Sequence, residues 1–275
     1  MKKGMRAIAA GVLGLIVVVM GLLGGCGGGV SNIDTVTGLA KIAPAGTEVL
    51  MHLDMGEMRT DGDLSGILEE MDLEFSELGI EGINYETLDY FWIVMTSDYA
   101  DELYVLGGTF DTAALGNALD EEFTRDEYRG VGIWAADDGA IAIYNSLLIF
   151  GSDGAVTGCL DVIAGAGTSA YDGNPDIRDV INRNPSGLIN IVAIEEGFYE
   201  TSAAMAMSIY KQSRDTARMS GSMKFGNEAD AAEAAADMES DMDTSSGVAG
   251  ATVDHRGLFV DFSAEMSMED IGLFW

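Results

Sequence analysis

Short runs rich in β-branched and aromatic residues alternate along the chain with longer segments whose apolar residues recur every three to four positions. Runs of the first kind, bounded by Gly, Asp, Asn or Pro, are typical of β-strands. They predict strands at 47–53, 90–97, 102–110, 128–136, 140–151, 188–195, 216–226, 247–254 and 257–264.

The segments with helical periodicity follow residues that can cap a helix. Asp63, Asp111, Ser152 and Asn227 each precede such a segment, and their side-chain oxygens can accept hydrogen bonds from the first free N–H groups of a helix. The pattern predicts helices at 64–79, 112–123, 153–165, 175–184, 197–212 and 227–240, with a short one after Ser267.

Several predicted strands are joined by short turns, at 98–101, 137–139 and 254–257. Turns of this length join antiparallel neighbours, whereas parallel strands need a long crossover. Within 140–151 most of the residues at alternate positions are apolar, so the predicted strand has one apolar face for helices to cover. We therefore expect an α+β fold in which antiparallel sheets are covered by helices.

The chain also contains an apparent internal repeat. "PAGTEVLMHLD" at 44 matches "PSGLINIVAIE" at 185, "LGGTFDTAALGNAL" at 106 matches "SGSMKFGNEADAAEAA" at 220, and "GVGIWAADDGAIAIY" at 130 matches "GVAGATVDHRGLFVDF" at 247. Self-similarity constrains a fold more strongly than local propensity does. It predicts two repeated halves of β-α-β-β-α type, at 38–184 and 185–275.

The N-terminus begins with Lys2, Lys3 and Arg6, followed by an uncharged apolar run from Ala7 to Leu23. This order is typical of a secretory signal, and the run is at the lower limit for crossing a membrane. Leu23-Gly24-Gly25-Cys26 resembles the lipobox of prokaryotic lipoproteins. That resemblance implies cleavage between Gly25 and Cys26 and a lipid, including palmitate, on Cys26.

Two or three acyl chains on one residue would hold a protein stably at a membrane. We therefore expect residues 1–25 to be a signal peptide and 26–37, which are small and polar, to be a flexible tether. The alternative is an uncleaved signal anchor. The body also resembles uncharacterised exported bacterial proteins with duplicated α+β halves, in the order of "PAGT", "GTFD", "YRG" at 128 and a tryptophan strand. These bring no known active site.

The protein is strongly acidic, with a net charge of −32 that becomes −35 once the three cations of residues 1–25 are removed. DNA, RNA and anionic lipid headgroups are bound through Lys and Arg, so we do not expect a nucleic-acid partner. The acidity is typical either of a solvated surface that keeps a protein soluble in high salt or of a surface that attracts cations and basic partners. The small number of lysines, five in the whole chain, favours the high-salt interpretation.

Few residues suit nucleophilic or metal chemistry. The chain has two histidines, His52 and His255, and neither G-x-S-x-G nor H-E-x-x-H, which disfavours a Ser-His-Asp hydrolase and a histidine zinc site. With Cys26 acylated, Cys159 has no disulfide partner, and its helical spacing with Val156 indicates a buried apolar side chain. We predict no catalytic residue and no cofactor.

One segment has the spacing of a calcium loop. Asp61, Asp63, Ser65 and Asp72 occupy positions 1, 3, 5 and 12 of "DGDLSGILEEMD", where such a loop places ligands. The helical stripe that begins at Leu64 competes with a loop over the same residues. We favour the helix and keep these four residues as weak calcium candidates.

Two further patterns have a structural and a functional interpretation. "GAGTSA" at 165 has the spacing of a dinucleotide loop but follows a helix, so Gly165 is better interpreted as a helix C-cap. The aromatic residues could line a carbohydrate or peptide groove, yet Trp92 and Trp134 lie in predicted strands, which favours core packing. Met205 and Met207 would pack against a neighbouring helix.

The lipobox resemblance, the tether and the acidity together predict a lipid-anchored protein on the extracytoplasmic side of the cell membrane or the outer membrane. We expect a binding or envelope-associated module whose partner is an envelope protein or a small ligand. The alternative is a carboxylate-based envelope hydrolase that acts on glycan or peptide. A cleft with two carboxyl groups roughly 5–10 Å apart would favour that alternative.

Overall fold

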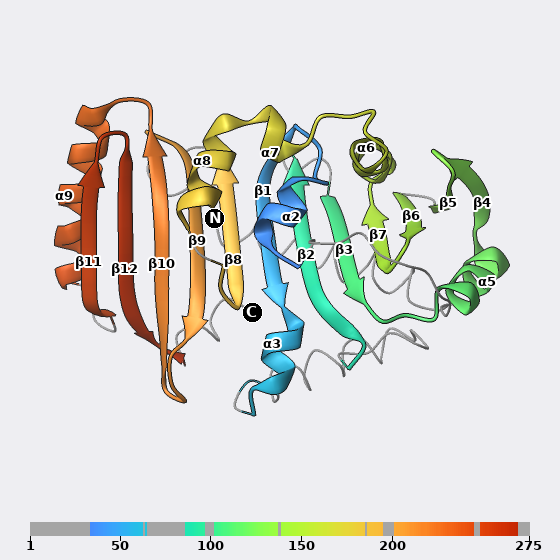
Figure 1. Cartoon of the computed structure of the whole chain (residues 1–275), viewed down its shortest axis with the longest axis horizontal. Coiled ribbons are helices and arrows are strands. Elements are labelled where there is room, and N and C mark those ends of the chain that lie inside the picture. Colours follow the sequence, from blue (N-terminus) through green and yellow to red (C-terminus); the bar gives the residue numbers. More distant parts are fainter. Residues whose placement is uncertain are drawn as a thin grey trace. The chain divides into compact units, whose positions relative to one another are not determined.

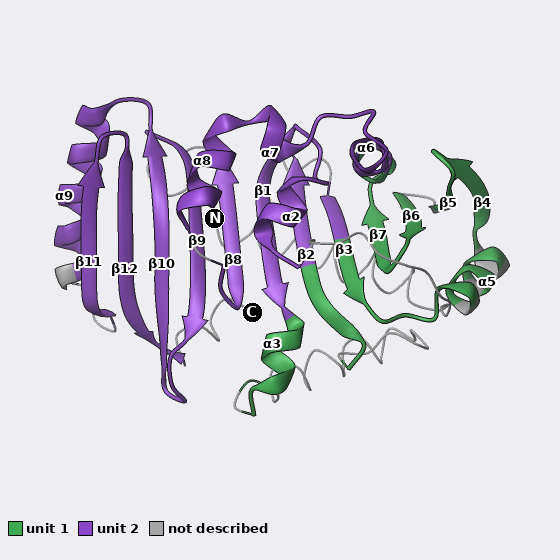
Figure 2. Cartoon of the chain, in the orientation of Figure 1, with its two compact units in different colours: residues 1–31, 55–91, 105–156 green, residues 32–54, 92–104, 157–275 purple. Residues whose placement is uncertain are grey.

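The structure is a computed structural model that describes residues 34–62, 64, 86–96, 102–136, 139–184, 186–194, 201–244 and 248–268. The chain divides into two compact units (Figure 2). The described residues of unit 1 lie within Met55–Phe91 and Val105–Val156, and those of unit 2 within Asn32–Asp54, Trp92–Tyr104 and Thr157–Trp275. Three elements have residues in both units: β2 (Leu88–Thr96), β3 (Glu102–Gly108) and α6 (Asp153–Ile163).

Unit 2 is built on antiparallel strands (Figure 1). Their order is β1-β8-β9-β10-β12-β11, and each neighbouring pair is antiparallel. The strands are β1 (Thr47–Asp54), β8 (Ile189–Ile194), β9 (Ser202–Lys211), β10 (Thr216–Phe225), β11 (Val248–Arg256) and β12 (Phe259–Ser267).

Helices cover both faces of this sheet. α8 (Pro175–Arg183) packs on β8, β9 and β10, whereas α9 (Glu228–Thr244) packs on β10, β11 and β12. Two shorter helices, α2 (Val36–Ala40) and α7 (Ala170–Gly173), lie beside α8 (Figure 1).

The alternation along β10 shows that α8 and α9 lie on opposite faces, because successive strand residues point to opposite sides. Met223 and Phe225 belong to the apolar cluster under α9. Lys224, between them, forms ion pairs with Asp176 and Asp179 of α8, both at 2.7 Å. The cluster under α9 consists of Met205, Met207, Met223, Phe225, Ala231, Ala234, Met238, Val260 and Phe262.

Unit 1 contains a four-strand antiparallel series in the order β4-β5-β6-β7. Its strands are β4 (Thr124–Tyr128), β5 (Val131–Ala136), β6 (Gly139–Tyr144) and β7 (Leu147–Gly151), and its helices include α3 (Met55–Thr60) and α5 (Thr112–Glu122). The predicted α+β class with antiparallel sheets is confirmed. The division into two repeated halves stays a prediction.

The helix predicted at 197–212 is wrong, because Ser202–Lys211 forms strand β9. Ala and Met favour helices in isolation, but here tertiary packing decides. Met205, Met207 and Ile209 are buried, and so are the residues between them. A strand buried on both faces lacks the polar alternation that would have distinguished it from a buried helix.

Two of the predicted strands each contain a turn. Residues 140–151 form β6 and β7, joined at Asn145, whose φ is 54°. Residues 128–136 contain the end of β4 and then β5, with a turn at Arg129 and Gly130, whose φ values are 54° and 78°. Positive φ at both central residues is the geometry of a type I′ hairpin. Asn145 and Gly130 are residue types that favour turns, and the prediction of two continuous strands overlooked both.

The other predicted elements within the described residues agree with the structure to within four residues at each end. The short helices α2, α3 and α7 were not predicted. The helix predicted at 64–79 lies outside the described residues apart from Leu64, and the one after Ser267 lies outside them apart from Met268.

Two of the predicted helix caps are confirmed. The Ser152 hydroxyl accepts a hydrogen bond from the backbone N–H of Ala155 at 3.3 Å, and the Asn227 amide oxygen accepts from Ala229 and Asp230 at 3.0 Å. Asp111 precedes α5, but its side chain makes no capping bond. Asp63 lies outside the described residues.

Candidate functional site

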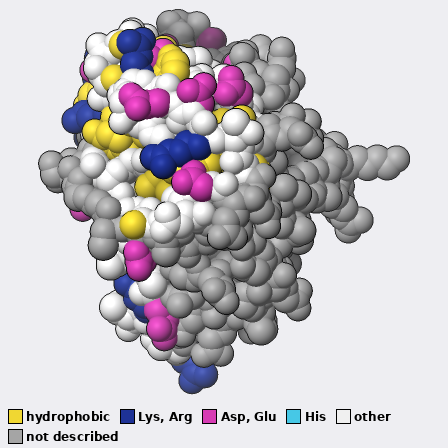
Figure 3. All heavy atoms as spheres, turned by 90° about the vertical axis from the view of Figure 1, so that its right-hand side faces the viewer, with side chains coloured by type: hydrophobic (Ala, Val, Ile, Leu, Met, Phe, Trp, Pro, Cys, Tyr) yellow, Lys and Arg dark blue, Asp and Glu magenta, His cyan; other side chains and the backbone are white. Residues whose placement is uncertain are grey.

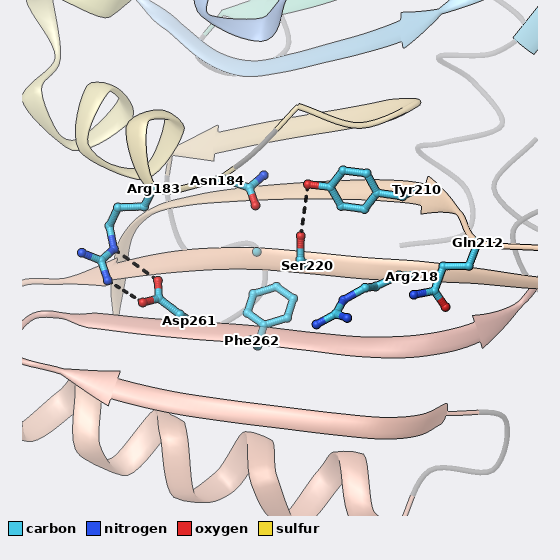
Figure 4. Close-up of a pocket in the computed structure, with 9 residues that line it drawn as sticks. Arg183, Asn184, Tyr210, Gln212, Arg218, Ser220, Asp261 and Phe262 are labelled. Carbon is cyan, nitrogen blue, oxygen red and sulfur yellow. Dashed lines mark hydrogen bonds and ion pairs between the residues drawn. The ribbon is translucent and has the colours of Figure 1, made fainter. Parts of the chain in front are cut away.

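An open groove lies on the α8 face of unit 2 (Figure 4). Its cavity volume is about 650 Å³, within the range of small-molecule sites. Strands β9, β10 and β12 form its floor, and the end of α8 forms one side. The lining residues are Arg183, Asn184, Tyr210, Gln212, Arg218, Ser220, Gly221, Asp261 and Phe262.

The strand alternation explains why this face is polar. Along β10, Met219 and Met223 point toward the α9 side. Arg218 and Ser220 occupy the alternate positions and point into the groove (Figure 4). α8 ends at Arg183 and so leaves these polar side chains accessible.

One end of the groove is held by an ion pair between Arg183 and Asp261. The Arg183 Nε donates to Asp261 Oδ1 at 3.2 Å, and Nη2 donates to Oδ2. The guanidinium also lies 4.2 Å from the ring centroid of Phe259, a cation–π arrangement. A two-point pair stacked on an aromatic ring fixes the direction of both side chains.

The carboxyl group of Asp261 is kept ionised by this arrangement. Partial burial, the largest influence, raises its pKa, but hydrogen bonds, including that from Arg183, and the charges of Arg183 and Arg256 outweigh burial. The pKa of Asp261 therefore lies below its ordinary value. A carboxylate acceptor is present in the groove at neutral pH.

The other end of the groove carries donors of a different kind. Arg218 Nη2 donates to the Ser263 hydroxyl at 2.9 Å, and Arg218 lies directly opposite Glu265 in the β10–β12 register. Ser220 donates to the Tyr210 hydroxyl at 3.4 Å, a long hydrogen bond. Gln212 follows β9 and is exposed. Guanidinium, hydroxyl and amide groups therefore lie close together on β9 and β10 and just past the end of β9 (Figure 4).

A series of hydrogen-bonded polar side chains runs from Asn184 at the groove into the core. The Asn184 amide lies 2.6 Å from the Ser208 hydroxyl, which donates to Asn190 Oδ1 at 2.7 Å. Asn190 also donates to the Gly187 carbonyl at 2.6 Å and accepts from the Gly187 N–H at 2.8 Å. Buried polar groups satisfied in this way fix a unique packing.

This series of hydrogen-bonded side chains ends at His52, which is 2% exposed. Asn190 donates its amide N–H to His52 Nδ1 at 2.8 Å, so Nδ1 acts as an acceptor. The imidazole ring lies 4.5 Å from the Trp92 ring, centroid to centroid. Burial lowers the pKa of His52 to about 4, and the charge of Asp34 opposes this only in part. His52 is therefore neutral in the folded protein at neutral pH.

A smaller hollow of about 320 Å³ lies in unit 1 between α5 and β5. The Trp134 indole N–H donates to Asp120 at 2.8 Å, and the Arg125 guanidinium lies 5.1 Å from the Trp134 ring. The Trp134 ring is only 3% exposed because Arg125 and α5 cover it. Figure 3 views the molecule from this side and shows cationic and acidic side chains close together.

The residues predicted to carry the lipid lie outside the described residues, as do Asp63, Ser65 and Asp72 of the weak calcium loop. Asp61 is described, and its carbonyl accepts a hydrogen bond from the Leu64 N–H. Within the described ranges, no group of three or more His, Cys, Asp or Glu side chains could hold a metal ion. In the same ranges, none of the helices is long and apolar enough to cross a membrane.

Three predictions about individual residues are confirmed. Cys159 is fully buried, and burial raises the pKa of its thiol to about 12. Trp92 and Trp134 are buried in strands. Gly165 ends α6 with a φ of 72°, and the Ala166 N–H bonds to the Asp161 carbonyl, the hydrogen bond of a Schellman cap. "GAGTSA" is thus a helix terminus rather than a nucleotide loop.

The sequence did not indicate the groove, because its residues come from α8, β9, β10 and β12, which are separated along the chain. The wrong helix prediction at 197–212 also concealed β9, one of the three strands that form the floor. The fold and the groove together define an α+β protein with an antiparallel sheet and an open site of ligand size whose lining includes polar side chains.

No known family and no curated protein matches the sequence. Among solved structures, this fold is similar to that of TP0453 in three crystal forms. Crystal form III gives a TM-score of 0.56 at 8% identity over 85% of this chain and 96% of that chain. Form IV gives 0.56 at 8% over 86% and 95%, and form I gives 0.52 at 9% over 86% and 95%. At such identities the likeness shows the fold alone.

Proposed function

We propose that this protein is a lipid-anchored, extracytoplasmic binding protein that takes a small polar ligand in the groove of unit 2. The observation that carries the binding part is the groove itself. Its donors and acceptors are oriented by contacts within the protein, above all by the pair between Arg183 and Asp261. Side chains held in place before a ligand arrives lose little conformational freedom on binding.

The anchoring part is supported by the sequence. Positive charges, an apolar run, small residues and Cys26 follow one another in the order of a lipoprotein signal. The residues between Cys26 and α2, which begins at Val36, would then separate the lipid from the folded body; the last two residues of the predicted tether, Val36 and Thr37, belong to that helix.

A binding role fits the groove better than hydrolysis by paired carboxylates. Glycoside cleavage needs two carboxyl groups flanking the scissile bond. Asp261 is the single carboxylate among the described residues that line the groove, and it is paired with Arg183.

Mass spectrometry of the protein purified from its native membrane tests the anchor. We expect a chain that begins at an acylated Cys26. Cys26→Ser should leave an unlipidated precursor, and the matched control Cys159→Ala should be acylated normally. An intact Met1 with no acyl mass on Cys26 would refute the anchor.

Native mass spectrometry of the same detergent-solubilised protein tests the binding role. We expect a fraction of the wild type to carry a co-purifying small molecule. Arg218→Ala should lose it, whereas Arg178→Ala, on α8 but outside the groove lining, should retain it. A ligand-free wild type, with no rise in unfolding temperature on adding small-molecule extracts of the envelope, would contradict the binding role.

A further inference from the structure

The groove is nearly balanced in charge, and this limits the class of ligand. Arg183 is neutralised by Asp261, and Arg218 faces Glu265 across the β10–β12 pair. Arg218 itself donates to the Ser263 hydroxyl, and the carboxyl end of Glu265 lies near Gly250 of β11. The lining residues carry two cations and one carboxylate, so the groove offers an anion no cluster of positive charge.

The charge of the whole protein acts in the same direction. A net charge of −32 produces a field that opposes the approach of anions at low and moderate ionic strength. A neutral ligand is not affected by this repulsion. The observations favour an uncharged ligand that uses both donors and acceptors.

The floor of the groove also disfavours a peptide bound by strand addition. Strand β10 pairs with β9 and with β12 along almost its whole length, from Ala217 to Lys224 on both sides. Its backbone N–H and C=O groups are therefore engaged in the sheet, and strand addition needs a free edge. A ligand in the groove has to be recognised by side chains.

Those side chains have the chemistry that hydroxyl groups need. The carboxylate of Asp261 accepts, the guanidinium of Arg218 donates, and the amides of Asn184 and Gln212 do both. Tyr210 adds an aromatic ring beside them (Figure 4). A sugar hydroxyl both donates and accepts, and the C–H face of a sugar ring packs on aromatic and aliphatic carbon.

We infer that the groove binds a neutral saccharide of one or two rings. The inference rests on the proposed binding function, and it names the ligand class. In the complex, Asp261 and Arg183 orient hydroxyls at one end, while Arg218 and Gln212 bind those at the other.

Saturation-transfer NMR on the detergent-solubilised full chain tests the ligand class. The neutral probes are N-acetylglucosamine, glucose, maltose and N,N′-diacetylchitobiose. Inorganic phosphate (followed by ³¹P line broadening), glucuronate and trialanine represent anions and peptides. We expect signal from at least one neutral saccharide, with no more than a trace from the others.

Matched variants then locate the site. Arg218→Ala and Gln212→Ala remove exposed groove side chains without opening the core, and each should raise the Kd of the bound saccharide about tenfold. Arg178→Ala should leave it unchanged. Saccharide binding that none of the groove variants weakens would overturn the assignment to the groove.

The outcomes separate this inference from the proposed function. Binding of glucuronate, phosphate or trialanine in preference to the neutral saccharides refutes the saccharide class but supports a binding groove. If no probe binds but native mass spectrometry still shows a co-purifying small molecule, the saccharide class is likewise refuted and the binding groove is supported. Failure of every probe together with a ligand-free native protein refutes both.

Discussion

The buried His52 predicts how the stability of the protein depends on pH. His52 is 2% exposed and accepts a hydrogen bond from Asn190 through Nδ1. Its pKa falls from 6.5 to about 4 on folding. Protonation inside the fold would place a cation in the core and remove the acceptor that Asn190 uses.

The sign follows from proton binding in the two states. Between pH 6.5 and about 4 the unfolded chain holds a proton on His52 that the folded chain does not, so stability falls as the pH falls. Above pH 6.5 this group contributes no pH dependence, and below about pH 4 its effect is complete. One pKa unit corresponds to 1.36 kcal/mol, so the shift costs about 3 kcal/mol of unfolding free energy.

His52→Gln removes the titration while keeping an acceptor for Asn190. Urea unfolding of wild type and variant, followed by tryptophan fluorescence between pH 7.5 and pH 4, gives the difference in stability at each pH. We expect the wild type to lose about 3 kcal/mol relative to the variant across this range. Titrating carboxylates act equally in both chains and cancel in the difference.

The same experiment on His255→Gln separates the effect of a buried histidine from that of removing any histidine, because His255 is exposed. Parallel wild-type and His52→Gln curves, differing by a constant amount from pH 7.5 to pH 4, would refute the reasoning. They would mean that His52 ionises as readily in the folded protein as in the unfolded chain.

Three further predictions concern packing and reactivity. Gly221→Ala should destabilise the protein by about 1–3 kcal/mol in urea unfolding, because the new Cβ would lie 2.3 Å from the Phe262 ring and 2.7 Å from the Ala206 carbonyl. Gly226→Ala, whose new Cβ would have no atom within 4 Å, is the control, and equal stabilities of the two variants would contradict the clash. Lys224→Met should lower the free energy of unfolding by about 1 kcal/mol at low salt and by less in 1 M NaCl, because Lys224 links β10 to Asp176 and Asp179 of α8. A loss of stability that does not depend on salt would argue against the ion pairs. Cys159 should react with a maleimide only in denaturant, because its thiol is buried and burial raises the pKa of the thiol. Peptide mass spectrometry locates the label, and labelling of Cys159 in the native protein would show that α6 opens.

The sequence indicated the fold class because most elements carry their own signal. α8 has a Pro at its start and Asn174 as its cap, and β10 has an alternating pattern in which only one register buries its methionines. β9 could not be recognised, because Ala and Met on both faces describe a buried helix equally well. The deciding information was the neighbouring strands, which a local pattern does not contain.

The groove could not be predicted from the sequence for a related reason. Arg183 and Asp261 are 78 positions apart, and each has the appearance of an ordinary surface charge. Their significance arises from the register that places β12 beside β10 and from the point at which α8 ends. Lipid attachment is the opposite case, because the lipobox resemblance is local and needs no tertiary contact.

The way the chain passes between the units has a practical consequence for dissecting the protein. Each unit is assembled from separated stretches, and β2, β3 and α6 change unit part-way along their length. A cloned fragment with one start and one end cannot contain a whole unit and leave the other out. Deletion from the N-terminus past Val36, or from the C-terminus into β12, should therefore remove parts of a hydrophobic core rather than release an autonomous piece, and function has to be mapped by point substitution.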